Sequence, residues 1–246
     1  KTHLVHQGKV DHQPGYTGEG IIMGFIDTGI DFTQPDFKNK DGSTRILKLW
    51  DQAVNNDTTL RPHFGYGEVY SSTMINNGSC THIDPAGHGT QVTGLGVGNG
   101  LSVPDSVADY SGHAPQADML FVATDFRLAN WTLTVAEGVQ WIFEEAEKLG
   151  KPCVVNLSLG TYLGGHDGKD LAAQLIDSLV AAKPGRFVVC AAGNAGNLAP
   201  FHLRTDITND TSIKYFKQNK NSSFGNAVFI EGWGDTNDLK DIQLGF

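Results

Sequence analysis

Four short apolar runs, separated by helical patterns, constrain the fold of this chain more than any other feature. They cover residues 20–27, 117–123, 153–159 and 186–192. Runs that are apolar on both faces are typical of strands buried in a parallel sheet. Residues 131–149 and 171–182 place apolar side chains at helical spacing. The alternation predicts an α/β fold of three layers, in which a mainly parallel sheet carries helices on both faces.

Two stretches depart from this alternation. Residues 38–84 form a long excursion with many turn residues, which we interpret as a loop with a short strand or hairpin and not as a separate domain. Residues 201–246 alternate polar and apolar side chains and are rich in Asn and Asp. That pattern is typical of antiparallel strands with one solvated face. We therefore predict that the architecture changes near residue 200, where a β-rich insertion starts.

Composition argues against several classes of function. The net charge of −9 disfavours non-specific nucleic-acid binding, which needs a basic surface. No apolar run is long enough to predict a membrane span. The cysteines Cys80, Cys153 and Cys190 have no metal-ligand spacing, and the last two lie in apolar runs, which predicts buried free thiols. No signal-peptide pattern is present, so we expect a processed chain or one that starts inside a longer precursor.

Three polar residues stand where hydrolytic chemistry needs them. Asp27 ends the first apolar run, Asn194 follows the last one, and His88 opens a run of small residues that predicts a closely packed helix. Sites in open α/β sheets form at the carboxyl ends of strands. There an Asp can orient an imidazole, the imidazole can act as general base toward a hydroxyl nucleophile, and an Asn amide can donate to a developing oxyanion.

Each motif alone also has a different interpretation. A strand that ends in Asp-Thr-Gly is often only a turn, and Gly193 with Asn194 suits a left-handed turn. Asp-Thr-Gly is also the signature of aspartic peptidases, which need two such aspartates and an all-β chain. Here the motif occurs once, inside an α/β pattern. The order and context of the three motifs together favour serine-type hydrolysis.

The chain resembles the subtilisin-like serine peptidases from residue 13 to about residue 200. The resemblance is carried by residues 26–30, 34–37, 87–94, 156–160 and 191–196. It implies Asp27 as the acid of the triad, His88 as the base and Asn194 as the oxyanion donor.

The resemblance also implies two substrate-binding segments. One pairs with the substrate backbone as an added strand and consists of Ser158, Leu159 and Gly160. The other lines the first specificity pocket and consists of Ala191, Ala192 and Gly193. On this basis residues 1–200 are the N-terminal part of a subtilisin-like catalytic domain, and residues 201–246 begin an incomplete, jelly-roll-like insertion.

The sequence departs from the family pattern at several positions. Gln91 stands where the family usually has a second His, which is no triad member. Asp36 matches a calcium-ligand position, but residues 98–112 do not repeat the usual calcium loop. No cofactor is required, and a structural calcium ion is allowed. Residues 44–51 and 66–67 resemble the subgroup that includes the spore-germination subtilases, in which a jelly-roll lies between the oxyanion Asn and the nucleophile.

The nucleophilic serine of the family lies in Gly-Thr-Ser-Met-Ala, and this chain contains no Gly-Thr-Ser. Ser158 is expected to bind substrate, and Ser222 and Ser223 lie in a turn-like stretch. In one explanation the polypeptide continues past Phe246 and supplies the serine. In the other, the protein is a subtilisin-like pseudopeptidase that acts as a binding or regulatory module. Burial favours the first, because a chain without the serine-bearing helix leaves one face of the sheet uncovered.

We therefore expect a serine endopeptidase that cleaves peptide bonds by acyl transfer and whose serine lies beyond this chain, so that the chain alone is inactive. The expected partners are a peptide or protein substrate and the serine-bearing segment of the same protein, with neither nucleic acid nor membrane involved. The resemblance implies a secreted or cell-envelope location.

Overall fold

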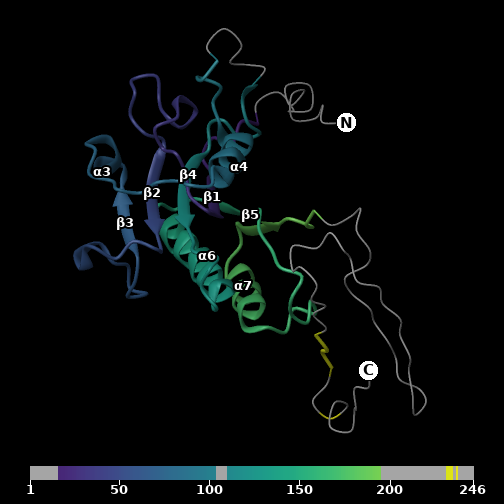
Figure 1. Cartoon of the computed structure of the whole chain (residues 1–246). Helices are drawn as coiled ribbons and strands as arrows, with labels where there is room; N and C mark the ends of the chain where they lie inside the picture. Colours follow the sequence, from purple (N-terminus) through teal and green to yellow (C-terminus); the bar gives the residue numbers. More distant parts are fainter. Residues whose placement is uncertain (1–15, 104–109, 195–230, 235–236, 238–246) are drawn as a thin grey trace, which may run out of the picture. The chain divides into compact units, whose positions relative to one another are not determined.

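The computed structural model describes residues 16–103, 110–194, 231–234 and 237 (Figure 1). The chain divides into two compact units. The first contains the residues up to Gly160 together with Leu171–Ala192, and the second contains Thr161–Asp170 and the residues from Gly193 onward. Nearly all of the predicted β-rich insertion, residues 201–246, lies outside the described residues and stays a prediction.

The first unit is built on a six-stranded sheet in the order β3-β2-β4-β1-β5-β6. The strands are β1 (Ile22–Asp27), β2 (Ile46–Asp51), β3 (Glu68–Ser71), β4 (Asp118–Ala123), β5 (Cys153–Leu157) and β6 (Arg186–Cys190). Every neighbouring pair is parallel except β2 and β3. The four predicted strands and the mainly parallel sheet are confirmed. The excursion contains the antiparallel pair β2 and β3, as predicted, and β2 joins this pair to the main sheet by pairing with β4.

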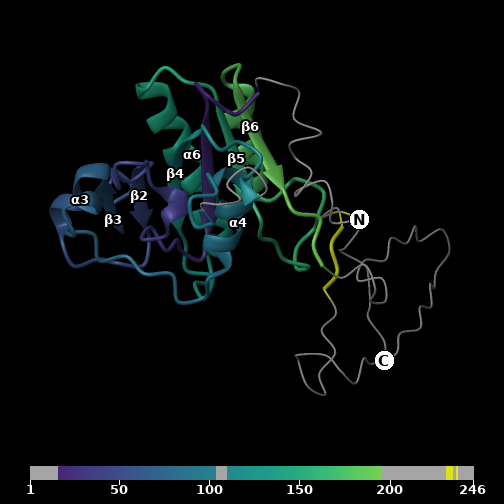
Figure 2. The same cartoon turned by 90° about the horizontal axis from the view of Figure 1, so that it is seen from above.

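Helices cover both faces of this sheet, as predicted. One face carries α6 (Trp131–Lys148) and α7 (Leu171–Ala181), and the other carries α3 (Ser72–Asn76) and α4 (His88–Val97). In Figure 2 the strands lie between α6 and α4. Two short 3-10 helices, η1 (Pro35–Phe37) and η2 (Thr58–Leu60), lie in the connections.

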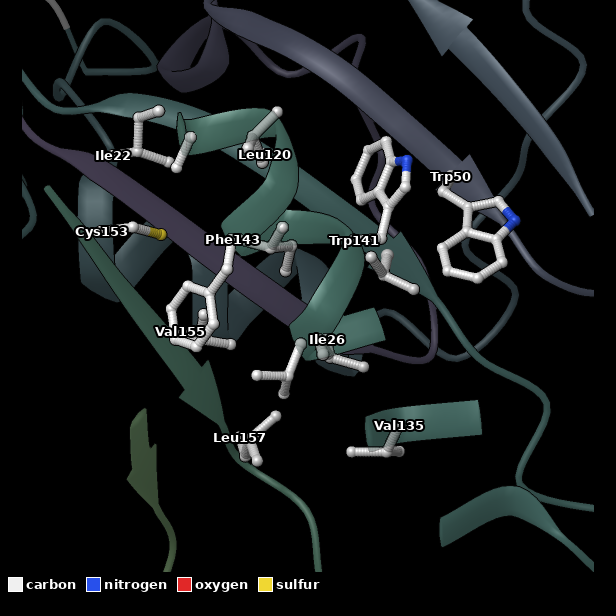
Figure 3. Packing of buried hydrophobic residues seen from close by; sticks show 14 residues of the cluster. Ile22, Ile26, Trp50, Leu120, Val135, Trp141, Phe143, Cys153, Val155 and Leu157 are labelled. Carbon is white, nitrogen blue, oxygen red and sulfur yellow. The ribbon is translucent and has the colours of Figure 1, made fainter. Parts of the chain in front are cut away.

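Alternating strand side chains explain why the sheet needs cover on both faces. In β4, Leu120 and Val122 pack toward α6, whereas Met119 and Phe121 pack in the cluster that α4 joins. Figure 3 shows the first of these clusters, in which Phe143 of α6 lies among residues of the central strands. Burying each such aromatic or aliphatic side chain stabilises the fold by about 1.5–3 kcal/mol.

The edge strand β6 is less buried than its sequence predicts. Phe187 and Val189 are 59% and 54% exposed. They pair with Val154 and Asn156 of β5, which puts them on the sheet face that carries α4. Within the described residues no helix covers that face over β6, and this leaves apolar side chains open. The predicted burial of the two thiols is confirmed for Cys153 but wrong for Cys190, which is exposed.

Candidate active site

Asp27 is the last residue of β1 and is only 2% exposed. Its Oδ1 accepts hydrogen bonds from the backbone N–H of Thr28 and from Nδ1 of His88, both at 2.7 Å. Its Oδ2 is buried and has no hydrogen-bond partner among the described residues. A buried carboxylate aimed at an imidazole can orient the ring and stabilise its protonated form.

His88 is the first residue of α4, and its side chain is 54% exposed. Because Nδ1 faces the carboxylate of Asp27, we assign the proton of the neutral ring to Nδ1. The lone pair of Nε2 is then available to accept a proton from a nucleophile. The structure therefore brings together the predicted acid and base in the arrangement that general-base catalysis requires.

Gly89 allows α4 to approach the turn after β1. A Cβ atom at this position would lie 2.1 Å from the carbonyl oxygen of Gly29 and 2.9 Å from Cβ of Asp27. Any side chain here would push the helix away from Asp27. The glycine after His88 thus has a geometric reason, because it brings the imidazole within hydrogen-bond distance of the strand end.

Asp84 joins the turn after β1 to the start of α4. Its Oδ1 accepts from Thr28 Oγ1 at 3.2 Å and from the N–H of Gly87 at 3.0 Å. Its Oδ2 accepts from the N–H and the hydroxyl of Thr90, at 3.1 and 2.6 Å. Burial opposes ionisation of Asp84, but the bonds from Thr90, Gly87 and Thr28 outweigh it and lower its pKa.

A second, buried histidine–aspartate pair lies next to this turn. His82 is 4% exposed, and its Nδ1 lies 2.5 Å from Oδ2 of Asp51. The Nε2 of His82 accepts the backbone N–H of Ile30 at 3.0 Å. This pair was not predicted from the sequence, because His82 stands in no motif. The one available signal is that Asp51 ends a strand, as Asp27 does.

The predicted substrate-binding segments of the first unit follow neighbouring strands. Ser158 follows β5 and Ala191 follows β6, and the N–H of Ala191 donates to the carbonyl of Leu157 at 3.0 Å. Both stand at the carboxyl edge of the sheet, where β1 ends in Asp27. Leu159 and Gly160 continue the first segment, and Ala192 continues the second.

The remaining two predicted site residues, Gly193 and Asn194, belong to the second unit. Gly193 is left-handed, with φ of 88°, as the turn interpretation of this motif requires. The roles of both residues stay predictions from the resemblance.

Asp36, the calcium ligand that the resemblance allows, already accepts hydrogen bonds at its carboxylate and at its carbonyl oxygen. Its Oδ1 accepts the N–H of Ser102 at 2.9 Å, and its carbonyl oxygen accepts from Arg45 at 2.9 Å. The same guanidinium also donates to the carbonyls of Val97, Pro115 and Ala117. No group of three or more acidic, His or Cys side chains suited to a metal ion occurs in the part of the chain that the structure describes. Calcium binding therefore stays a prediction from the resemblance.

Comparison with known proteins gives consistent matches. The model of the subtilase family matches residues 18–229. Thermitase of Thermoactinomyces vulgaris is 28% identical over 222 residues, which cover 88% of this chain and 64% of thermitase. The PII-type proteinase of Lacticaseibacillus paracasei is 28% identical over 188 residues, 74% of this chain and 10% of that protein.

A solved structure agrees with these matches. The CspB protease of Clostridium perfringens superimposes with a TM-score of 0.64 at 30% identity, covering 77% of this chain and 39% of the CspB chain. The chain thus spans less than two thirds of each of these three proteins. Among the described residues, no helix combines the length and apolar character that a membrane crossing requires.

Proposed function

Because the chain belongs to the subtilase family, we propose that it forms the N-terminal part of the catalytic domain of a serine endopeptidase of the subtilisin type. The hydrogen bond between His88 and the buried Asp27 carries this proposal, since it places an oriented general base at the carboxyl edge of a parallel sheet. A peptide is the substrate class that membership of a protease family implies.

In this mechanism His88 works with a serine from a segment beyond Phe246. Its Nε2 takes the hydroxyl proton while the serine oxygen attacks the peptide carbonyl carbon, and the amide of Asn194 donates to the oxyanion. Asp27 stabilises the imidazolium. His88 then gives the proton to the leaving amine, and water repeats the sequence to hydrolyse the acyl-enzyme.

The residues after β5 and β6 suit binding of an extended peptide. Ser158, Leu159 and Gly160 follow a strand and offer backbone groups with which a substrate can pair as an added strand. Ala191 and Ala192 are exposed and small, which leaves space for a large substrate side chain beside them. Both segments then direct a peptide along the carboxyl edge of the sheet, where β1 ends in Asp27.

The exposed side of β6 supports a serine-bearing segment in the complete protein. Phe187 and Val189 are more than half exposed on the face that carries α4. A further helix packed there would bury them on the same face of the sheet as the helix of His88. The likeness to the CspB protease supports a subtilase fold for this chain, and the insertion before the serine is part of this proposal. The secreted or cell-envelope location remains part of this proposal.

The test uses the full-length gene product and its His88→Ala variant. The wild-type protein should cleave an unstructured protein substrate and should be labelled on a serine by a fluorophosphonate probe. The variant should lose cleavage. Cleavage that persists without His88 and resists the fluorophosphonate would refute the serine mechanism. Peptide binding without any turnover in the wild type would instead indicate the pseudopeptidase alternative.

A further inference from the structure

The buried pair formed by His82 and Asp51 contacts residues 28–30, the turn that follows Asp27, which we call the Asp27 turn. We infer that His82 is a positioning residue: it holds the backbone of Ile30, and through it the Asp27 turn, in the geometry that His88 needs. This inference rests on the proposed roles of Asp27 and His88. His82 contacts the turn at the N–H of Ile30 and acts only through this contact.

The hydrogen bonds of His82 define which nitrogen carries its proton. Ile30 donates its N–H to Nε2 at 3.0 Å, so Nε2 must present a lone pair. The proton therefore sits on Nδ1 and is donated to Oδ2 of Asp51 at 2.5 Å. The other oxygen of Asp51 accepts the N–H groups of Ala53 and Val54, which fixes the carboxylate. The carboxylate at the end of β2 thus selects the tautomer that can hold Ile30.

His82 and Asp84 anchor the Asp27 turn at two points from one short segment. His82 holds the N–H of Ile30, and Asp84 holds the hydroxyl of Thr28. Asp84 also accepts from Thr90 in the first turn of α4. A shift of residues 82–84 would therefore move both the turn that follows Asp27 and the helix that carries His88.

The segments around Asp27 and His88 are packed so closely that such a shift would disturb the Asp27–His88 pair, which we call the dyad. A Cβ atom on Gly29 would lie 2.9 Å from Cα of Asp84, and one on Gly89 would lie 2.1 Å from the carbonyl oxygen of Gly29. The three segments are thus in backbone contact. Displacements of about 1 Å in a catalytic group can lower the rate by about 100-fold.

The sharpest test is Asp51→Asn, because it changes one atom and no volume. If the amide oxygen keeps the N–H groups of Ala53 and Val54, its NH₂ faces Nδ1 of His82. The ring must then accept at Nδ1 and carry its proton on Nε2, where it opposes the N–H of Ile30. The variant therefore removes the anchor on Ile30 while both side chains stay in place.

The experiment compares Asp51→Asn, His82→Ala and His82→Gln with the full-length wild type. His82→Gln keeps an acceptor within reach of Ile30. The controls are Asp118→Asn, at the opposite end of the sheet, and His63→Gln, a half-exposed histidine 3.7 Å from Glu144. Two readouts are measured on variants with wild-type circular dichroism: kcat and KM for a peptide, and the downfield NMR resonance of the His88 Nδ1 proton, assigned by its loss in His88→Ala.

We expect Asp51→Asn and His82→Ala to lower kcat by about 10–100-fold with KM changed less than about threefold, and to shift or broaden the His88 resonance. His82→Gln and both controls should keep the resonance and most of kcat. Wild-type kcat and resonance in Asp51→Asn would overturn the positioning role. So would loss of folding in both Asp51→Asn and His82→Ala, since the pair would then be needed for folding itself. If the wild type cleaves nothing, the proposed function fails, and the resonance still decides whether His82 positions the dyad.

Discussion

Nδ1 of His88 and Oδ1 of Asp27 lie 2.7 Å apart although the two residues are 61 positions apart in the chain. Three local features make this contact. Asp27 stands at the end of a buried parallel strand, Gly89 lets α4 approach the following turn, and Asp84 ties that turn to the helix. The contact is therefore a product of the packed first unit and does not depend on the side chains of the dyad alone.

Asp27→Asn in the full-length protein should lower kcat by about 10⁴-fold. In the proposed mechanism, the change removes the negative charge that stabilises the His88 imidazolium, while the side chain keeps its size. KM should change little, because Asp27 is buried and the predicted peptide-binding segments follow other strands. Steady-state kinetics with a chromogenic peptide measures both constants.

Asp118→Asn is the matched control for that variant. Asp118 is the first residue of β4, at the opposite end of the sheet from Asp27, and it pairs with Lys151. This variant also removes one carboxylate charge, but Asp118 does not contact Asp27 or His88. The kcat should therefore stay within about twofold of wild type. An equal loss of kcat in both variants would contradict the role assigned to Asp27.

Asp84→Asn should alter the dependence of stability on pH. The folded-state pKa of Asp84 is lowered below the ordinary value of 3.8, so the protein gains stability from its ionised form above that pH. This contribution is lost as the pH falls below about 4 and passes through the lowered pKa. The variant should be less stable at neutral pH, with a shallower loss of stability on acidification.

Chemical denaturation between pH 3 and pH 7 measures this effect. Asp41→Asn serves as control, because the pKa of Asp41 is also lowered but by hydrogen bonds from Ser43 in its own exposed turn. The control should change stability much less at any pH. A slope against pH in Asp84→Asn identical to that of the wild type would show that Asp84 is not ionised in the way its contacts indicate.

Much of the fold could be predicted because its signals are local. An apolar run of seven or eight residues and an amphipathic period are visible within one window of sequence, and the strands and helices of the structure lie close to those windows. The end of α6 is such a case, since Gly150 has a left-handed φ of 65° and the N–H of Lys151 closes the helix on Ala146. The Asp27–His88 contact was predictable only because both residues stand in motifs.

The features that were not predicted depend on contacts between distant segments. His82 meets Asp51 across 31 positions and Ile30 across 52, and no motif contains His82 or indicates that it contacts these two residues. The exposure of β6 was not predicted for the same reason. The apolar run around Val189 indicates a buried strand, but burial depends on whether a distant segment packs on that face. A hydrophobic period of two or 3.6 residues shows that one face of a strand or helix is apolar, but it does not show which segment packs on that face.

Arg45→Met should destabilise the protein by at least about 3 kcal/mol. The guanidinium donates to four backbone carbonyls in the connections around η1 and α4, and the variant removes all four of these hydrogen bonds. Arg45→Lys should recover less than half of the loss, because an ammonium group cannot span both pairs of acceptors. Urea denaturation measures the three free energies of unfolding.

The contacts of Asp36 lead to a prediction about the effect of a chelator on stability. Since a guanidinium already binds the carbonyl of Asp36 and a backbone N–H binds its carboxylate, EDTA should leave the thermal unfolding midpoint of the wild type unchanged. Scanning calorimetry with and without EDTA checks this. A lower midpoint in EDTA that calcium restores, and that Asp36→Asn makes insensitive to EDTA, would show that Asp36 does bind the ion.

Two glycines of α4 should respond to alanine in opposite directions. A Cβ on Gly89 meets the carbonyl oxygen of Gly29 at 2.1 Å, so Gly89→Ala should push α4 from the Asp27 turn, cost about 1–3 kcal/mol of stability and lower kcat. A Cβ on Gly94 meets nothing within 4 Å, so Gly94→Ala should stabilise the helix by about 0.5–1 kcal/mol with kcat unchanged. Thermal unfolding and peptide kinetics are measured on both variants. Together they separate the effect of helix propensity from the effect of the close contact between α4 and the turn after β1. Equal effects of the two substitutions would show that the approach of α4 to the turn is not what Gly89 provides.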